Sequence, residues 1–338
     1  MRYLLTCLCL ALMPIQASAD VKVYVHPQAA VQPTRGGRTL SHLFAFEGRI
    51  YAGYGDYGRN TGPIAINPFV PDSGFAGVEH VSQTEAILQF RRVGTSLVAP
   101  AVDPVGYGTV GTDYAVKDAH GWRDVDEIGV IHAYDAGGDR DLETLVGAAA
   151  ERGPAVWRRV DGEWRIEAPH QFPQSNLYLP HGGEFRYHFI ASFGGQTYVQ
   201  LHGDRWSRIW NGMRWLPGPN LLPNGGTGWR ATVWRESLFY LENGVGNGER
   251  NGSVDVDTPS RLLRFDGLTP EIVRENVYDV TCDGARCHAL DSAGTVWVTQ
   301  DGQTWSVRAQ FPTSARSIAV LDERLYAGGL EATLFAEA

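Results

Sequence analysis

The stretch Leu43–Gly53, LFAFEGRIYAG, has the composition of a short β-hairpin. Apolar residues fill both halves, Glu47–Gly48 form a turn between them, and the second half ends in a tyrosine followed by small residues. Two apolar runs joined by such a turn predict a pair of antiparallel strands. A single hairpin is not stable alone in water, so the fold depends on how the pattern continues along the chain.

The hairpin pattern recurs along the whole chain, with its turns 39 to 58 residues apart. Units of this size hold about four short strands and are typical of β-propeller blades. The copies begin at Leu43 (LFAFEGRIYAG), Leu88 (LQFRRVGTSLVAP), His132 (HAYDAGGDRDLETLVGA), Phe189 (FIASFGGQTYVQL), Thr232 (TVWRESLFYLE), Tyr278 (YDVTCDGARCHAL) and Ile318 (IAVLDERLYAG).

A second hairpin follows most copies, and its Asp-Gly or Asn-Gly turn suits the positive φ of tight hairpins. Clear cases are AVWRRVDGEWRI from Ala155, SRIWNGMRWL from Ser207 and TVWVTQDGQTWSV from Thr295. The last copy is one strand short, and pairing it with VKVYVHP near the start would remove the free edges. We therefore predict an all-β, seven-bladed β-propeller over residues 20–338 as one domain. Six or eight blades stay open because the region from Ile131 is irregular.

The first nineteen residues predict export. MRYLLTCLCLALMPIQASA contains one arginine, a short apolar run and a small-residue site, which indicate a secretory signal peptide cleaved after Ala19. We expect a secreted or periplasmic bacterial protein that does not insert into a membrane. Its net charge of −9 argues against a nucleic-acid partner. Cys282 and Cys287 flank a four-residue turn, and in an exported protein they should form a disulfide.

One turn resembles a motif of a known group of proteins. Val298–Val307, VTQDGQTWSV, resembles the Asp box of sialidases and other secreted propellers, and the matching residues are Thr299, Asp301, Gly302, Thr304 and Trp305. The resemblance implies a structural role, in which Asp301 bonds turn amides and Trp305 packs between blades. It does not extend to a true sialidase, because the Phe-Arg-Ile-Pro motif is absent. GYGDYGRNTGP from Gly53 also resembles a group of secreted propellers with a GD…NTGP loop, which implies no activity.

Polar residues stand where the innermost strands should begin. In a propeller these positions face one central axis, and the set comprises His42, Glu85, His132, Arg186, His188, Arg230, Asp279 and Arg316. Arginines and histidines in an acidic chain predict a cationic channel mouth that attracts an anionic ligand; the alternative is a water-filled structural channel. The glycine-rich loop after the first hairpin adds Asp56, Arg59, Asn60 and Thr61, unless it is only a well-packed turn.

Catalysis in such a mouth would need an acid and a base with separated pKa values. Asp135, His181 and Tyr134 are further candidates for this chemistry. We predict Glu85, His132, His188 and Asp56 as catalytic residues, and Arg186, Arg230, Arg316, His42, Asn60, Asp103 and Tyr187 as ligand-binding residues.

Two reactions fit these residue types. An arginine that neutralises a uronate, with a tyrosine or histidine as base, would make a polysaccharide lyase, whereas two carboxylates across a sugar would make a glycosidase. The sequence thus predicts a propeller that binds a glycan, preferably an anionic one, and leaves cleavage open. The alternative is an envelope protein without enzymatic activity that holds a protein partner. No cofactor is predicted; calcium in the oxygen-rich loop Glu242–Arg261 is a lesser alternative to a mobile lid, because the loop lacks the EF-hand pattern.

Overall fold

The computed structural model describes residues 20–105, 112–130, 132–138, 140–149, 153–167, 186–202, 204–243 and 256–338. The predicted signal peptide, Ile131 and His181 lie outside the described residues, as does the 244–255 part of the predicted calcium loop. No helix in the described ranges is long and apolar enough to cross a membrane.

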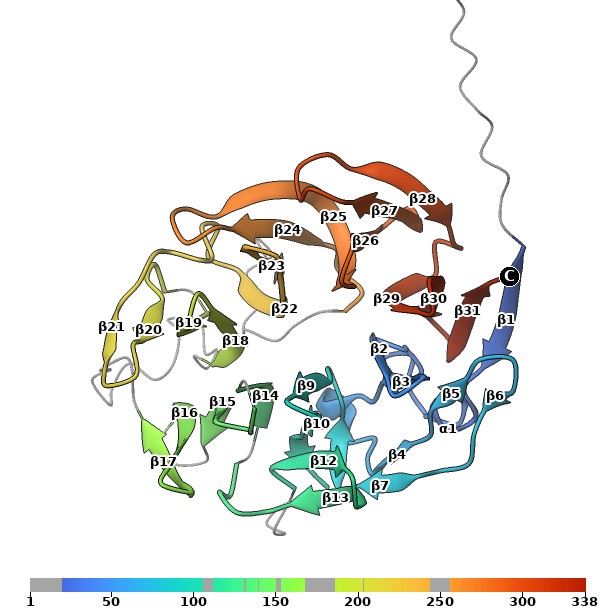
Figure 1. Cartoon of the computed structure of the whole chain (residues 1–338). Coiled ribbons are helices and arrows are strands. Elements are labelled where there is room, and N and C mark those ends of the chain that lie inside the picture. The colour runs from blue at the N-terminus through green and yellow to red at the C-terminus, as the bar shows by residue number, and fades with distance from the viewer. Residues whose placement is uncertain are drawn as a thin grey trace, which may run out of the picture.

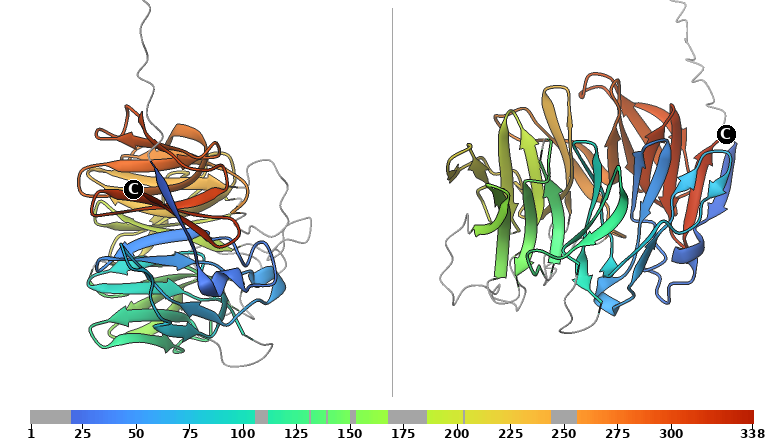
Figure 2. Two further views of the ribbon diagram at one scale, coloured as in Figure 1. Left: turned by 90° about the vertical axis from the view of Figure 1, so that its right-hand side faces the viewer. Right: turned by 60° about the horizontal axis from the view of Figure 1, so that its bottom comes forward.

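Antiparallel sheets arranged around a common centre make up the described chain (Figure 1). The chain passes from one sheet to the next around this centre, and seen from the side the sheets lie next to one another across a thick disc (Figure 2). Two short helices, α1 (Pro27–Ala30) and the 3-10 helix η1 (Tyr57–Arg59), are the helical elements among the described residues. The prediction of an all-β chain is confirmed.

Four sheets in the described part of the chain have four strands each. The first contains β2 (His42–Phe46), β3 (Arg49–Gly53), β5 (Phe69–Val70) and β6 (Gly74–Phe75), and the second contains β9 (Arg91–Val93), β10 (Ser96–Pro100), β12 (Tyr114–Asp118) and β13 (Gly121–Val125). The third contains β18 (Tyr187–Phe193), β19 (Gln196–Leu201), β20 (Arg208–Trp210) and β21 (Trp215–Pro217). The fourth contains β29 (Ala315–Leu321), β30 (Arg324–Gly329), β31 (Thr333–Glu337) and β1 (Val21–Val25). Since β1 pairs with β31, the two ends of the described chain share one sheet.

Two larger sheets and one small pair complete the strands. The six-stranded sheet holds β14 (His132–Gly137), β15 (Thr144–Ala149), β16 (Gly153–Val160) and β17 (Glu163–Glu167), with β11 (Val102–Pro104) and β8 (Thr84–Ala86) beyond β14. The seven-stranded sheet holds β22 (Thr227–Trp234), β23 (Ser237–Asn243), β24 (Ser260–Phe265), β25 (Glu271–Cys282), β26 (Cys287–Asp291), β27 (Thr295–Thr299) and β28 (Ser306–Gln310). β4 (Ile64–Ile66) pairs with β7 (His80–Ser82).

The strand β25 is long because it serves two groups of strands. Its first half pairs with β24 and its second half with β26, with register shifts in both ladders. Apolar clusters fill the space between neighbouring groups; for example, the rings of Phe189 and Tyr240 lie 5.1 Å apart and join β18 to β23. Burial of such aromatic side chains contributes most of the stabilisation of a fold of this kind.

The disulfide prediction is confirmed: Cys282 and Cys287 are bonded across the end of the β25–β26 ladder. In the turn after β27, a side-chain oxygen of Asp301 accepts hydrogen bonds from the amides of Gln303 and Thr304 at 2.8 and 2.7 Å. These bonds hold the pKa of Asp301 below its usual range.

The aromatic residue of the same turn packs against a different group of strands. The ring of Trp305 lies 6.5 Å from that of Phe239 on β23. Gly302 has φ +78°, and a Cβ there would approach the Phe239 ring to 3.1 Å. The turn therefore has the geometry that the Asp-box resemblance implies, while the resemblance itself stays a prediction.

Candidate functional site

The glycine-rich loop after β3 lies directly against β8. A Cβ on Gly55, whose φ is +113°, would stand 2.5 Å from the carbonyl oxygen of Glu85. A Cβ on Gly62 would stand 2.3 Å from the carbonyl oxygen of Thr84. Only glycine allows two backbones to approach this closely. The glycines of the loop therefore let its backbone lie directly against β8.

This close approach brings Asn60 to Glu85. Asn60 has a left-handed backbone, and when its amide nitrogen faces Glu85 it lies 2.9 Å from a carboxylate oxygen. The hydroxyl of Thr61 accepts from the Asp56 amide at 2.7 Å and donates to the Glu85 carbonyl at 3.4 Å. The loop is thus both a packed turn and the support of a polar group at the carboxylate.

Three adjoining strands place Glu85, Asp103 and His132 together. Val102 in β11 pairs with Ala86 in β8 and with His132 in β14. Asp103 has a left-handed backbone, and its carboxylate lies in contact with Nδ1 of His132. The side chains of Asp103 and His132 keep 22% and 15% exposure, so a ligand can reach them.

The two carboxylates of this group have different surroundings. Glu85 is 5% exposed, and burial raises its pKa to about 7, with a further increase from the negative charge of Asp103. The carboxylate of Asp103 faces the imidazole of His132 instead. Glu85 is therefore partly protonated near neutral pH, while a second carboxylate lies against a histidine. We call Asn60, Glu85, Asp103 and His132 the Glu85 cluster.

Tyr134 links the Glu85 cluster to two more predicted residues. Its ring stacks on His132 with centroids 5.8 Å apart and lies 4.1 Å from the ring of His188. Its hydroxyl accepts a hydrogen bond from the guanidinium of Arg186. Burial raises the pKa of the Tyr134 hydroxyl, so it stays protonated. Of the predicted site residues, the structure thus brings six together: Asn60, Glu85, Asp103, His132, Arg186 and His188.

Other predicted site residues have structural partners. Nδ1 of His42 accepts from the Phe90 amide at 2.9 Å, and burial holds the His42 pKa well below its usual value. Tyr187 is 1% exposed within the apolar core. The Asp56 carboxylate accepts from Thr34 at 2.7 Å.

Arg316 likewise has protein partners. It lies 3.2 Å from Asp257, and its guanidinium stands over the ring of Tyr278 at 4.3 Å. The predicted catalytic or binding roles of Arg316, His42, Tyr187 and Asp56 stay predictions, and the structure gives each side chain a packing role as well.

Arg230 joins strands on different sides of the centre. It is 3% exposed and donates to the carbonyls of Leu88 and Ser41 at 2.7 and 2.6 Å. Its Nε lies 3.3 Å from the carboxylate of Asp279. Burial lowers the pKa of Arg230 and raises that of Asp279, and each group partly offsets the shift of the other. The guanidinium is thus committed to protein groups.

A second buried pair repeats this arrangement and was missed in the sequence. Arg91 forms two hydrogen bonds to the carboxylate of Asp135 at 2.6 and 2.7 Å and also reaches the carbonyl of Ala231 on β22. The signal was present, because Tyr-Asp occurs both at 134–135 and at 278–279 in corresponding repeats.

No group of three or more metal-ligating side chains occurs within the described ranges. Most of the predicted calcium loop falls outside them, so calcium binding stays a prediction. Asn243, near the start of this loop, donates its amide to the Thr258 carbonyl at 2.8 Å and to the Ser260 hydroxyl at 3.0 Å.

Comparison of the sequence with protein-family models and with curated proteins gives no match. Solved structures do match. The WD40 domain of Pan2 from Neurospora crassa has a TM-score of 0.60 at 11% identity, over 94% of this chain and 95% of that one. Virginiamycin B lyase from Staphylococcus aureus has a TM-score of 0.57 at 9% identity, over 94% of this chain and 98% of that one. The fold is that of a β-propeller. Identities this low show the fold and nothing about activity.

Proposed function

We propose that this protein is an exported β-propeller that binds an anionic glycan at the Glu85 cluster and cleaves it by elimination. The observation that carries the proposal is the pairing of a buried Glu85, whose pKa is raised to about 7, with the adjoining Asp103–His132 pair. We read the strand groups as seven blades, with β25 shared by two of them and β1 completing the last. The disulfide between β25 and β26 agrees with export into an oxidising compartment.

Each part of the cluster has a role in this reaction. His132 turns Nδ1 to Asp103, so its Nε2 is the nitrogen that would take the proton from the carbon next to the uronate carboxylate. Protonated Glu85 would give its proton to the leaving glycosidic oxygen as the carbon–oxygen bond breaks and a carbon–carbon double bond forms. Arg186, held by Tyr134, would neutralise the uronate carboxylate.

Hydrolysis by two carboxylates is the second candidate, and the position of Asp103 favours elimination over it. A nucleophile or base must face the sugar, whereas the Asp103 carboxylate faces the imidazole of His132. One of the structurally similar proteins is a lyase by name, so a propeller of this length can carry such a reaction.

The test is a panel of uronate, sulfated and neutral polysaccharides offered to the full mature chain. Elimination creates a conjugated double bond that absorbs ultraviolet light, whereas hydrolysis creates reducing ends without this absorbance. We expect Glu85→Gln to retain binding and to lose at least about 100-fold in kcat, the usual contribution of a general acid. The control is Glu271→Gln, an exposed residue paired with Arg264 on an outer strand, which should leave turnover unchanged.

Absence of binding to any polysaccharide would contradict the proposal and leave the protein-binding alternative. Binding with equal turnover by Glu85→Gln would contradict the assigned role of Glu85 alone.

A further inference from the structure

A polar side chain stands at a corresponding position on, or just before, each of the central strands β2, β9, β14, β18, β22, β25 and β29, and all but one of these side chains contact the next central strand or the residues just before it. We call this set the belt: His42, Gln89, Asp135, His188, Arg230, Asp279 and Ser317. In β14, β18, β22, β25 and β29 the register with the neighbouring strand shifts at this position. Such bulges turn a side chain out of the regular alternation, which here directs it along the ring.

The two acidic members show the pattern most clearly. Asp135 in β14 accepts from the amide of Ile190 in β18 at 3.1 Å, and Asp279 in β25 accepts from the amide of Ile318 in β29 at 3.0 Å. Each carboxylate also accepts from the amide of the residue that follows it. Each carboxylate therefore links the bulge of its own strand to the next central strand.

Members with neutral side chains make the same connection. Nε2 of Gln89, just before β9, donates to the carbonyl of Tyr134 in β14 at 2.6 Å. Nδ1 of His42 in β2 accepts from the amide of Phe90 at 2.9 Å.

The remaining bonded members complete the circuit from β22 back to β2. Arg230 in β22 lies 3.3 Å from Asp279 in β25. The hydroxyl of Ser317 in β29 donates to the carbonyl of Leu40, just before β2, at 2.7 Å. Six members of the belt are therefore bonded to the next central strand.

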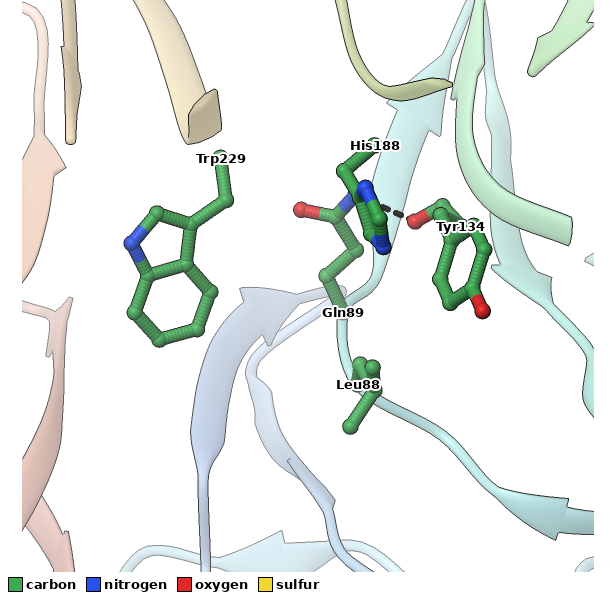
Figure 3. Close-up of a pocket in the computed structure, with 5 residues that line it drawn as sticks. All are labelled: Leu88, Gln89, Tyr134, His188 and Trp229. Carbon is green, nitrogen blue, oxygen red and sulfur yellow. Dashed lines mark hydrogen bonds between the residues drawn. The ribbon is translucent and has the colours of Figure 1, made fainter. Parts of the chain in front are cut away.

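His188 in β18 is the exception. It is 3% exposed, yet neither ring nitrogen has a hydrogen-bond partner among the described residues. Oε1 of Gln89 is also without a partner within these residues. Both side chains line a cavity of about 10 Å³, together with Leu88, Tyr134 and Trp229 (Figure 3). The cavity thus lies where the belt is interrupted, between β18 and β22.

The chemistry of the lining selects the occupant. Burial holds the pKa of His188 well below its usual value, and the positive charge of Arg186 lowers it further. The neutral ring offers one N–H donor and one bare nitrogen. The bond from Gln89 to the Tyr134 carbonyl fixes the amide, which therefore offers an acceptor, and Figure 3 shows this oxygen turned toward Trp229.

Charged occupants do not fit this lining. The positive charge of Arg186 near His188 disfavours a cation, and the acceptor oxygen of Gln89 with the aromatic walls disfavours an anion. A volume of about 10 Å³ is room for about one water-sized group.

We propose that this cavity is a binding site for a single uncharged hydroxyl-sized group, which donates to Oε1 of Gln89, bonds to a ring nitrogen of His188 and fills the break in the belt. Water and the hydroxyl of a small alcohol share this chemistry. The cavity adjoins the Glu85 cluster through Tyr134, whose ring packs on both His132 and His188, but the proposal does not depend on the function of that cluster.

High-resolution crystal structures of the mature chain, alone and soaked in methanol, test the proposal. We expect one density peak within hydrogen-bond distance of Gln89 Oε1 and a His188 nitrogen in both crystals. A peak that stays isolated in methanol assigns water as the occupant, and a peak that gains a methyl group assigns an alcohol hydroxyl. An empty cavity in both crystals would overturn the proposal.

Two substitutions keep the test independent of crystal solvent. His188→Phe should remove the peak and lower Tm by a few degrees, because the occupant loses a partner and Gln89 stays unsatisfied. If the cavity is dry, the same change removes two unpaired nitrogens and should raise Tm, which contradicts the proposal. His188→Gln keeps a donor and an acceptor, so the peak should persist; this variant remains informative if His188→Phe does not fold. His288→Phe, a buried histidine on β26 outside the cavity, is the control for a change of ring.

Discussion

The buried pair of Arg230 and Asp279 offers the strongest test of how the centre is held together. Arg230→Met keeps much of the volume and removes the charge, which leaves Asp279 at 1% exposure without its cation. Removing one partner of a buried ion pair destabilises a protein by about 3–5 kcal/mol. The change also removes the bonds from Arg230 to the carbonyls of Ser41 and Leu88.

The loss should depend on pH in a direction set by Asp279. Its pKa is raised to about 6, mainly by burial, so the folded state holds this proton more tightly than the unfolded state, where the pKa is 3.8. Stability associated with this group is therefore full below about pH 4 and falls as pH rises toward 6. Without Arg230 the pKa of Asp279 rises further, so the fall continues to higher pH, and the variant should lose more at pH 8 than at pH 5.

Urea unfolding of the mature chain at both pH values measures this loss, and a double-mutant cycle separates its parts. Asp279→Leu combined with Arg230→Met removes the unpaired charge, so the double variant should be more stable than Arg230→Met alone. Losses that simply add, or a loss of Arg230→Met that is the same at pH 5 and pH 8, would refute the assignment of this pair as a coupled clamp.

Three further predictions concern the loop, the site and the disulfide. Gly55→Ala should destabilise the fold by more than about 1 kcal/mol because its Cβ would meet the Glu85 carbonyl. The control is Gly74→Ala, where φ is also positive but a Cβ would meet no atom, so that only the backbone penalty applies. Thermal unfolding of the two variants compares their losses. Asp103→Asn removes the negative charge that raises the Glu85 pKa, so the alkaline limb of a kcat/KM profile should move to lower pH; an unmoved limb would contradict the coupling. Reduction of the disulfide between β25 and β26 should lower the free energy of unfolding by about 2 kcal/mol, since its loop is short; chemical denaturation with and without reductant checks this.

The hairpins could be predicted because their determinants are local. The stretch Leu43–Gly53 contains the apolar runs and the turn that become β2 and β3, with Phe46 opposite Arg49. Asp161–Gly162 adopts the positive φ values that its Asp-Gly sequence predicts, between β16 and β17. The disulfide was predictable for the same reason, because only four residues lie between the two cysteines.

The use of the polar residues at the centre could not be predicted. His42 and Arg230 have the side chains of ligand-binding residues, but in the structure their atoms bond to protein groups far away in sequence, and 189 residues separate Arg230 from Ser41. A sequence shows which donors and acceptors exist and not which of them are already bonded. The residues of the Glu85 cluster could be predicted, but the contact between Asp103 and His132 could not. This contact depends on the left-handed backbone of Asp103 and on β8, β11 and β14 lying side by side.

The belt and the Glu85 cluster share strands in this molecule. His132 and Asp135 lie three residues apart on β14, separated by the bulge at Tyr134. The bonds from Asp135 to Arg91 and to the Ile190 amide fix that bulge, and so they fix the direction of His132 toward Asp103. A belt side chain thus positions a group of the Glu85 cluster without touching a ligand. The bulge is held by a few polar bonds, whereas the sheet around it is held by its apolar core. Removing the bonds of Asp135 is therefore expected to disturb the Glu85 cluster before the protein unfolds.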